Sequence, residues 1–264
     1  MPSNSIQLIL LDLDGTLYVD KEVVPGAPAA LSRLRKQSYL LRFLTNTTTR
    51  SHAELLNQLR QMDFAVDDAE LISAPAAARL ELQAMQEQRG EKIRLWPVVA
   101  DAIKADFDQF VIDEQHPDFI VLGDIGDHWN IELINRLFNA MHEGAQLISL
   151  HKNRFWQTAD GLKADIGFFV AGLEYVTGQT AQIMGKPTAA FFQRVLDSVK
   201  ISADKTLLVG DDLDSDVGGA QAMGIQGVLV KTGKFRQTYL DKSSIRPDGI
   251  LNTVAELPAW LEGR

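Results

Sequence analysis

The chain has 264 residues, 45% of them hydrophobic, and a formal net charge of −9 at pH 7. This length allows one large domain or two modest ones, and the acidic character argues against nucleic acid as a routine partner. The chain contains no cysteine, which excludes disulfides and thiolate metal sites, so any metal must be bound by oxygen or imidazole ligands.

The N-terminal sequence MPSNSI lacks the basic and apolar segments of a signal peptide. No stretch of the sequence approaches the roughly 20 apolar residues that a membrane span needs. We therefore expect a cytoplasmic protein without a membrane partner.

Apolar runs typical of strands alternate with helix-like stretches along the chain. The strands are expected at residues 8–13, 40–45, 119–122, 147–150, 206–209 and 228–230. The clearest helices are expected at residues 51–63, 131–143, 189–199 and 254–262. Such alternation predicts an α/β fold with a doubly wound, mostly parallel sheet and helices on both of its faces.

A charge-rich and weakly patterned stretch at residues 79–113 interrupts this series, and a second strand-helix series follows it. We interpret residues 79–182 as an inserted α/β domain. The core domain then consists of residues 1–78 and 183–264.

Short polar stretches stand at the ends of the predicted core strands. They are Asp12-Leu13-Asp14-Gly15-Thr16, Thr45-Asn46 and Gly210-Asp211-Asp212-Leu213-Asp214-Ser215-Asp216, and a fourth, Gly185-Lys186-Pro187, precedes the helix at 189–199. Ligands of doubly wound sheets bind beyond the carboxyl ends of the strands. All four stretches are therefore candidate functional segments.

Each stretch alone also has a plain structural explanation. Asp14-Gly15 is a common turn dipeptide, Thr45-Asn46 suits a turn or a helix cap, and Gly185-Lys186-Pro187 suits a surface turn. The stretch GDDLDSD favours a bound cation, because four carboxylates over six positions repel one another unless positive charge offsets them.

Together and in this order, the four stretches resemble the motif set of the haloacid dehalogenase (HAD) superfamily phosphatases. The insertion between the second and third stretches resembles the subfamily with a large α/β cap, subfamily IIA. Residues 164–192 and 210–235 are most similar to the branch that contains phospholysine phosphohistidine inorganic pyrophosphate phosphatase.

This resemblance implies a magnesium-dependent phosphatase that forms an aspartyl-phosphate. It assigns the nucleophile to Asp12 and the general acid and base to Asp14. Phosphoryl oxygens are then bound by Thr45, Asn46 and Lys186. Mg²⁺ is held by the Asp12 carboxylate, the Asp14 backbone carbonyl and Asp211, with Asp216 and Asp212 orienting its water ligands. An aspartate suits the nucleophile's role because it is ionised at neutral pH and needs no base to activate it.

The resemblance also implies that the inserted domain determines which substrate is accepted. We expect a small phosphorylated substrate, with phospholysine, phosphohistidine or inorganic pyrophosphate as the alternative. A regulatory phosphate-binding module is the alternative that is not an enzyme. Because many members of the subfamily dimerise through the cap, a homodimer is also an expectation.

Two stretches of the inserted domain carry less information. The segment 151–162, HKNRFWQTADGL, combines cations with aromatic residues and suits equally a substrate entrance or a packed hairpin. Residues 126–129 also suit a functional loop, but we interpret them as helix capping and packing. His128 and His151 are too isolated in the sequence to be assigned as ligands.

Overall fold

The computed structural model describes residues 6–158 and 161–263. The chain forms two compact units. The core unit comprises Met1–Thr45, Ala53–Ile72 and Lys186–Arg264, and the inserted unit comprises Asn46–His52 and Ser73–Gly185. The inserted unit thus begins a few residues before the expected 79–182 and includes a short segment around residue 50. Its expected role in substrate choice stays a prediction.

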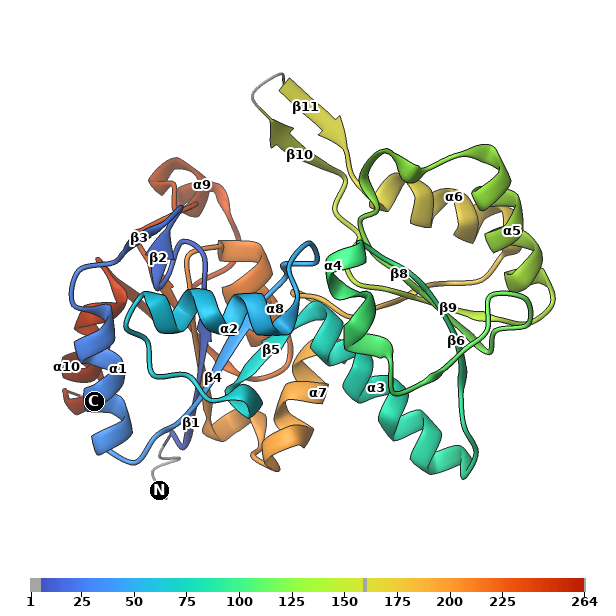
Figure 1. Cartoon of the computed structure of the whole chain (residues 1–264). Helices are drawn as coiled ribbons and strands as arrows, with labels where there is room; N and C mark the ends of the chain where they lie inside the picture. Colours follow the sequence, from blue (N-terminus) through green and yellow to red (C-terminus); the bar gives the residue numbers. More distant parts are fainter. Residues whose placement is uncertain (1–5, 159–160, 264) are drawn as a thin grey trace. The chain divides into compact units, whose positions relative to one another are not determined.

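The core unit is built on a six-stranded sheet with the strand order β15-β14-β13-β1-β4-β5. Figure 1 labels three of these strands, β1, β4 and β5. These strands are β1 (Leu8–Asp12), β4 (Leu40–Thr45), β5 (Leu71–Ser73), β13 (Thr206–Gly210), β14 (Gln226–Val230) and β15 (Gly249–Leu251). β1 pairs in parallel with β13 and β4, and β14 pairs in parallel with β13 and β15. The predicted α/β class is confirmed.

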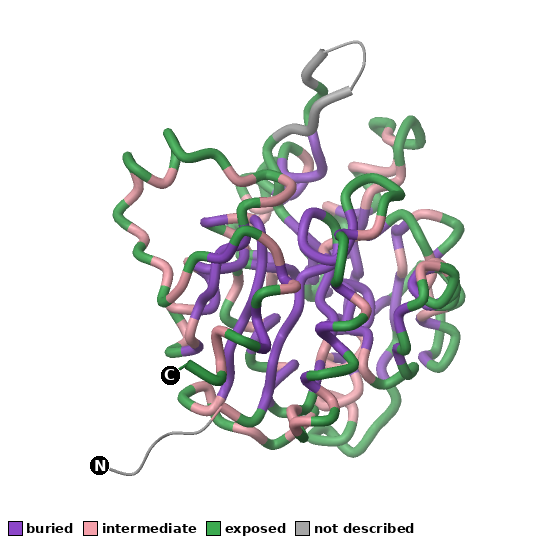
Figure 2. Tube along the Cα trace, turned by 90° about the vertical axis from the view of Figure 1, so that its left-hand side faces the viewer, coloured by how far each residue is buried: buried purple, intermediate pink, exposed green. Residues whose placement is uncertain are grey.

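The central strands are apolar because helices cover both sides of the sheet. All five residues of β1, LILLD, are buried, as expected for a strand without a solvent-facing side. Alternate side chains such as Ile9 and Leu11 pack into one cluster with helices α1, α2 and α10. In Figure 2, which colours the trace by burial, buried stretches alternate with more exposed ones along the chain.

The remaining elements of the core unit surround this sheet. The helices are α1 (Ala27–Lys36), α2 (His52–Gln61), α7 (Ala189–Val199), α8 (Gly219–Ala222), α9 (Gln237–Lys242) and α10 (Leu257–Glu262). Shorter helical turns are η1 (Asp68–Glu70), η4 (Ala203–Lys205), η6 (Val254–Glu256) and the π-helical η5 (Leu213–Gly218). β2 (Tyr18–Val19) and β3 (Glu22–Val23) form a small antiparallel hairpin.

The inserted unit has its own five-stranded sheet in the order β12-β9-β8-β6-β7, parallel at every pair. Its strands are β6 (Arg94–Val98), β7 (Val111–Ile112), β8 (Phe119–Leu122), β9 (Gln146–Ser149) and β12 (Gln182–Ile183). Its helices are α3 (Ala74–Arg89), α4 (Asp101–Lys104), α5 (Ile131–His142) and α6 (Gly167–Thr177), with 3₁₀ turns η2 (Ala105–Phe107) and η3 (Gly126–His128). β10 (Phe155–Thr158) and β11 (Gly161–Ala164) pair as an antiparallel hairpin.

The predicted strands and helices occur at the expected places, with ends shifted by one or two residues in most cases. The weakly patterned stretch nevertheless contains most of α3 and all of β6. The buried face of α3 is largely alanine, as at Ala74, Ala77 and Ala78, and small side chains give a weak hydrophobic periodicity. None of the helices in the described parts of the chain has the length and apolarity needed to cross a membrane.

Candidate active site

The carboxylate of Asp12 lies at the carboxyl edge of the core sheet, at the end of β1. Asp12 is the last residue of this strand and is 7% exposed. Its Oδ2 accepts a hydrogen bond of 3.1 Å from the Thr16 hydroxyl. Its Oδ1 lies 2.5 Å from Nζ of Lys186, which is also buried. A buried carboxylate with these two partners is oriented and electrostatically compensated.

The residues after Asp12 form a turn. The turn expected at Asp14-Gly15 therefore lies within the candidate site. Gly15 has φ of +92°, a conformation that favours glycine, and its N–H donates to the Tyr18 carbonyl over 2.7 Å. A Cβ at Gly15 would come within 2.0 Å of Oδ2 of Asp211. Asp14 is exposed at the start of this turn, and its role as general acid and base stays a prediction.

The acidic stretch after β13 contributes two buried carboxylates, Asp211 and Asp216. Oδ1 of Asp216 lies 2.6 Å from Nζ of Lys186, and its Oδ2 accepts the N–H of Asp212 over 3.1 Å. Asp212 caps η5 by accepting hydrogen bonds from the N–H groups of Asp214 and Ser215. Short π-helical segments of this kind are frequent at functional sites.

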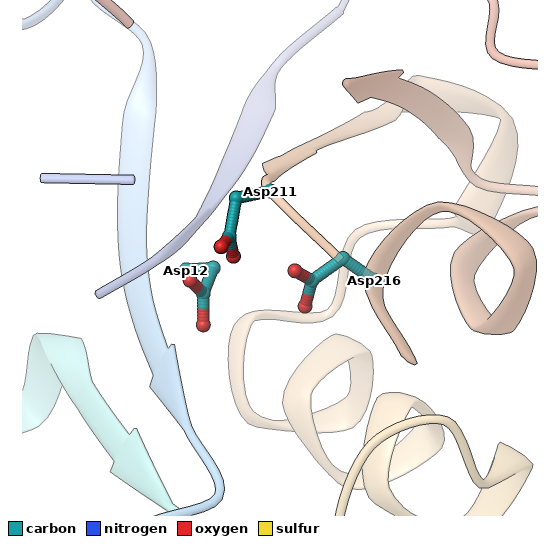
Figure 3. A group of neighbouring side chains, drawn as sticks. All are labelled: Asp12, Asp211 and Asp216. Carbon is teal, nitrogen blue, oxygen red and sulfur yellow. The ribbon is translucent and has the colours of Figure 1, made fainter. Parts of the chain in front are cut away.

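Asp12, Asp211 and Asp216 form an acidic triad whose carboxylates turn toward a common space (Figure 3). One oxygen from each lies within 4.8 Å of the other two. Oxygen atoms on opposite sides of a Mg²⁺ ion are about 4 Å apart, because each Mg–O distance is about 2.1 Å. The donor set and spacing therefore fit Mg²⁺ after a small contraction. Ligation by the Asp14 carbonyl stays a prediction.

Charge in the triad is unbalanced, since the three carboxylates carry two more negative charges than Lys186 neutralises. Burial raises the pKa of Asp211 and of Asp216 to about 6, and it also raises the pKa of Asp12. Burial lowers the pKa of Lys186, but Asp12 and Asp216 raise it by more, so this lysine stays protonated. A divalent cation bound here would supply the missing positive charge.

The predicted phosphate-binding residues are Thr45 and Asn46, and the first segment of the core unit ends between them in the sequence. Thr45 is the buried last residue of β4, one position beyond Leu44, which pairs with Asp12. Asn46 is the first residue of the inserted unit. Within that unit, a Cβ at Gly185 would lie 3.1 Å from Oδ1 of Asn46. The roles of Thr45 and Asn46 in binding phosphate stay predictions.

Four residues of this site were not assigned from the sequence. They are Thr16, Thr232, Gly233 and Lys234, whose contacts reach Asp12, Gly15 or Asp211. The last three lie two to four residues beyond the end of β14, but the sequence KTGK resembles a solvated turn and gives no signal for a site.

A cavity of about 510 Å³ lies in the inserted unit. It opens where β6 and β8 end, and its apolar wall includes Trp96, Val98 and Ile125. The guanidinium of Arg136 lies 4.6 Å from the Trp96 ring centroid and forms a 2.9 Å ion pair with Glu114. A cavity of this size and lining is suited to a small organic molecule.

The predicted packing role of residues 126–129 is confirmed for Trp129, whose ring stacks on Phe169 with centroids 3.6 Å apart. Gly126 and His128, however, also line the 510 Å³ cavity. Of the segment 151–162, residues 159 and 160 and the side chains of Phe155 and Trp156 lie outside the described part of the structure. His151 is buried two residues beyond the end of β9.

Comparison with known proteins shows which family the chain resembles. A haloacid dehalogenase-like hydrolase model matches residues 9–110, and a HAD-hydrolase-like model matches residues 183–257. The human haloacid dehalogenase-like hydrolase domain-containing protein 2 is 37% identical over 243 residues, covering 92% of this chain and 90% of that protein. Human phospholysine phosphohistidine inorganic pyrophosphate phosphatase is 33% identical over 254 residues, covering 94% and 91%.

Among solved structures, 4-nitrophenylphosphatase from Thermotoga maritima superposes with a TM-score of 0.84 at 25% identity, covering 97% of each chain. Its similarity extends over both the core unit and the inserted unit. The chain therefore belongs to the haloacid dehalogenase-like hydrolase family.

Proposed function

We propose that the chain is a Mg²⁺-dependent phosphatase that hydrolyses a small phosphorylated compound through an aspartyl-phosphate on Asp12. The observation that carries this proposal is the position of Asp12, a buried carboxylate at a strand end beside Lys186. A nucleophile needs such fixed orientation and charge compensation to approach an anionic phosphate. The phosphatases among the similar proteins support the same reaction class.

In the first half of the reaction, an oxygen of Asp12 attacks phosphorus, and the bond between phosphorus and the leaving oxygen breaks. Asp14 donates its proton to the departing oxygen, a role that agrees with its exposed position. The ammonium of Lys186 offsets negative charge throughout this step, together with hydrogen bonds from Thr45 and Asn46.

In the second half, Asp14 takes a proton from a water molecule, whose oxygen attacks phosphorus. The bond between phosphorus and Asp12 breaks, which releases inorganic phosphate and regenerates the carboxylate. Asp12 and Asp211 would hold Mg²⁺, while Asp216 and Asp212 orient its water ligands. When bound, Mg²⁺ supplies the positive charge that lets an anionic nucleophile meet an anionic substrate.

The inserted unit, we infer, determines which leaving group is accepted. Its cavity beside Trp96 and Arg136 supports this role, since the lining combines apolar with charged side chains. The net charge of −9 makes a small phosphorylated molecule a better candidate than nucleic acid. A homodimer through this unit is part of the proposal and agrees with the exposed side chains of Phe168 and Tyr175 on α6.

The test is release of phosphate from p-nitrophenyl phosphate in the presence of Mg²⁺, followed by acid quenching during turnover. The proposal expects a protein-bound phosphate that hydroxylamine releases, as an acyl phosphate requires. The Asp12→Asn variant is the control and should trap none. Phosphate binding without turnover by the wild-type protein would contradict the proposal and favour a regulatory phosphate-binding module.

A second candidate is hydrolysis of inorganic pyrophosphate or of a phosphorylated lysine or histidine. The observation that favours it is the 33% identity to a phosphatase named for these substrates. Comparing p-nitrophenyl phosphate, pyrophosphate and imidodiphosphate under identical conditions separates the candidates. A kcat/KM for imidodiphosphate or pyrophosphate far above that for phosphate esters would favour this second candidate.

A further inference from the structure

The segment after β14, Thr232-Gly233-Lys234, contacts two separate parts of the acidic site. We refer to it as the 232–234 loop. The Thr232 hydroxyl donates a hydrogen bond to the Gly15 carbonyl in the turn that follows β1. The backbone N–H of Lys234 donates to Oδ2 of Asp211 over 2.6 Å. The loop therefore connects the nucleophile's turn to a carboxylate of the triad.

Gly233 lets the loop approach both partners closely. Its φ is +53°, in the region that favours glycine. A Cβ there would lie 2.1 Å from Oδ2 of Asp211 and 2.5 Å from Cα of Gly15. Because a Cβ at Gly15 would also reach 2.0 Å from this oxygen, Oδ2 of Asp211 is enclosed between two glycine backbones.

We propose that the 232–234 loop is a positioning element for the cation site, which fixes Asp211 through Oδ2 so that Oδ1 binds Mg²⁺ as a one-oxygen ligand. This inference rests on the proposed function insofar as the cation is Mg²⁺. Groups that orient a metal ligand typically change metal affinity 10- to 100-fold when they are lost. A one-oxygen carboxylate also suits the octahedral shell of Mg²⁺, whereas Ca²⁺ readily takes both oxygens of a carboxylate.

The side chain of Lys234 has a separate contact. Its ammonium lies 3.1 Å from Oδ2 of Asp212, but the side chain is 72% exposed. An exposed ion pair contributes little, so the positioning is attributed to the backbone of the loop and to the Thr232 hydroxyl. Thr232 is consequently the position where a side-chain substitution tests the inference.

The test uses Thr232→Val, which removes the hydroxyl at nearly constant volume, and Thr232→Ser, which retains it. The matched control is Thr206→Val. The Thr206 hydroxyl also donates to a backbone carbonyl, that of Ser202 over 2.9 Å, but at the start of β13, the opposite end of the strand from Asp211.

Binding of Mg²⁺ is measured by calorimetry on metal-free protein without substrate, and by the rise in Tm with Mg²⁺ concentration. We expect Thr232→Val to weaken Mg²⁺ binding about tenfold, and Thr232→Ser to restore it to within about twofold of wild type. The preference for Mg²⁺ over Ca²⁺ should shrink in Thr232→Val. Its kcat at saturating Mg²⁺ should change far less than the Mg²⁺ concentration that gives half-maximal activity.

Gly233→Ala is the second variant, because its methyl group must displace the loop from Asp211. It should weaken Mg²⁺ binding at least as much as Thr232→Val, provided that circular dichroism shows a folded protein. Equal Mg²⁺ affinity in wild type and Thr232→Val, or an equal loss in Thr206→Val, would overturn the inference, as would a wild type that binds no Mg²⁺. A wild-type protein that binds Mg²⁺ but hydrolyses no phosphate ester would contradict the proposed function. The calorimetric comparison of Mg²⁺ affinities would still decide the role of the 232–234 loop.

Discussion

Nζ of Lys186 lies 2.5 Å from Oδ1 of Asp12, and both side chains are buried. The same ammonium contacts Asp216 over 2.6 Å, so one lysine links the proposed nucleophile to the acidic stretch after β13. This arrangement makes Lys186 the ion-pair partner of two buried carboxylates, so we expect it to contribute to stability as well as to its proposed role in catalysis.

Lys186→Met should therefore destabilise the metal-free protein, because it leaves two buried carboxylates without their cation. The expected loss is about 3 kcal/mol in the free energy of unfolding, measured by urea denaturation. The control Lys36→Met removes an exposed lysine at the end of α1 and should change stability by less than about 0.5 kcal/mol. Similar stabilities of the two variants would show that Lys186 is not a structural ion-pair partner.

Replacement of Asp12 by Asn should abolish turnover while the fold stays intact. The amide is neutral, a poor nucleophile and a weaker metal ligand, so kcat with p-nitrophenyl phosphate should fall more than about 1,000-fold. Circular dichroism and Tm serve as the control for folding. More than a tenth of the wild-type rate in this variant would exclude Asp12 as the nucleophile.

The strand-end residues of this site are predictable from sequence because charge directly after an apolar run is unusual. That pattern distinguishes Asp12, Asp14 and Asp211 from scattered surface carboxylates, and the fold brings Asp12 and Asp211 together with Asp216. The 232–234 loop is not predictable in this way because KTGK resembles a solvated turn. Its contacts use a backbone N–H, a hydroxyl and the lack of a side chain, none of which composition reveals.

The inserted unit is less predictable for a different reason. Helix α3 buries mainly alanines and begins at the cap Ser73 with a proline in its first turn, so its hydrophobic stripe is faint. β7 and β12 have two residues each and are recognisable only through their pairing with β6 and β9. Pairing between distant segments depends on tertiary contacts, which a local pattern does not encode.

Chelation with EDTA should remove phosphatase activity, and added Mg²⁺ should restore it. Ca²⁺ should inhibit, because its larger and less regular shell allows both oxygens of Asp12 to bind and so misaligns the attacking atom. The measurement is initial rate against Mg²⁺ at several fixed Ca²⁺ concentrations, with competitive behaviour expected. Full activity after thorough chelation would contradict the metal requirement.

Stability of the metal-free protein should depend on pH through Asp211 and Asp216. Their pKa values are raised to about 6 in the folded protein, mainly by burial, from an ordinary value of 3.8. Between about pH 4 and pH 6 the folded state therefore binds more protons than the unfolded state, and the contribution of these groups to stability falls as pH rises. The full penalty of two buried charges is present from about pH 7, one unit above these pKa values.

Asp211→Asn removes one of these groups and should flatten the fall in Tm between pH 5 and pH 7.5. Saturating Mg²⁺ should raise the Tm of the wild-type protein more at pH 7.5 than at pH 5, because the ion binds the ionised carboxylates. Parallel Tm curves for wild type and Asp211→Asn across this range would show that Asp211 does not titrate with a raised pKa.

The last prediction separates substrate choice from phosphoryl chemistry. If the cavity beside Trp96 accepts the leaving group, Arg136→Met should lower kcat/KM for a physiological substrate several-fold more than for p-nitrophenyl phosphate. The synthetic ester has a good leaving group and gains little from remote contacts, while charge stabilisation at the phosphoryl group is common to both substrates. Arg94→Met is the matched control, because Arg94 also forms an ion pair, with Asp118 over 2.8 Å, but at the opposite end of β6. The Arg94→Met variant should change kcat/KM only slightly, and equally for the two substrates. Equal losses on both substrates in a folded Arg136→Met protein would mean that Arg136 supports the packing of α5 against Trp96, and that substrate choice depends on other residues.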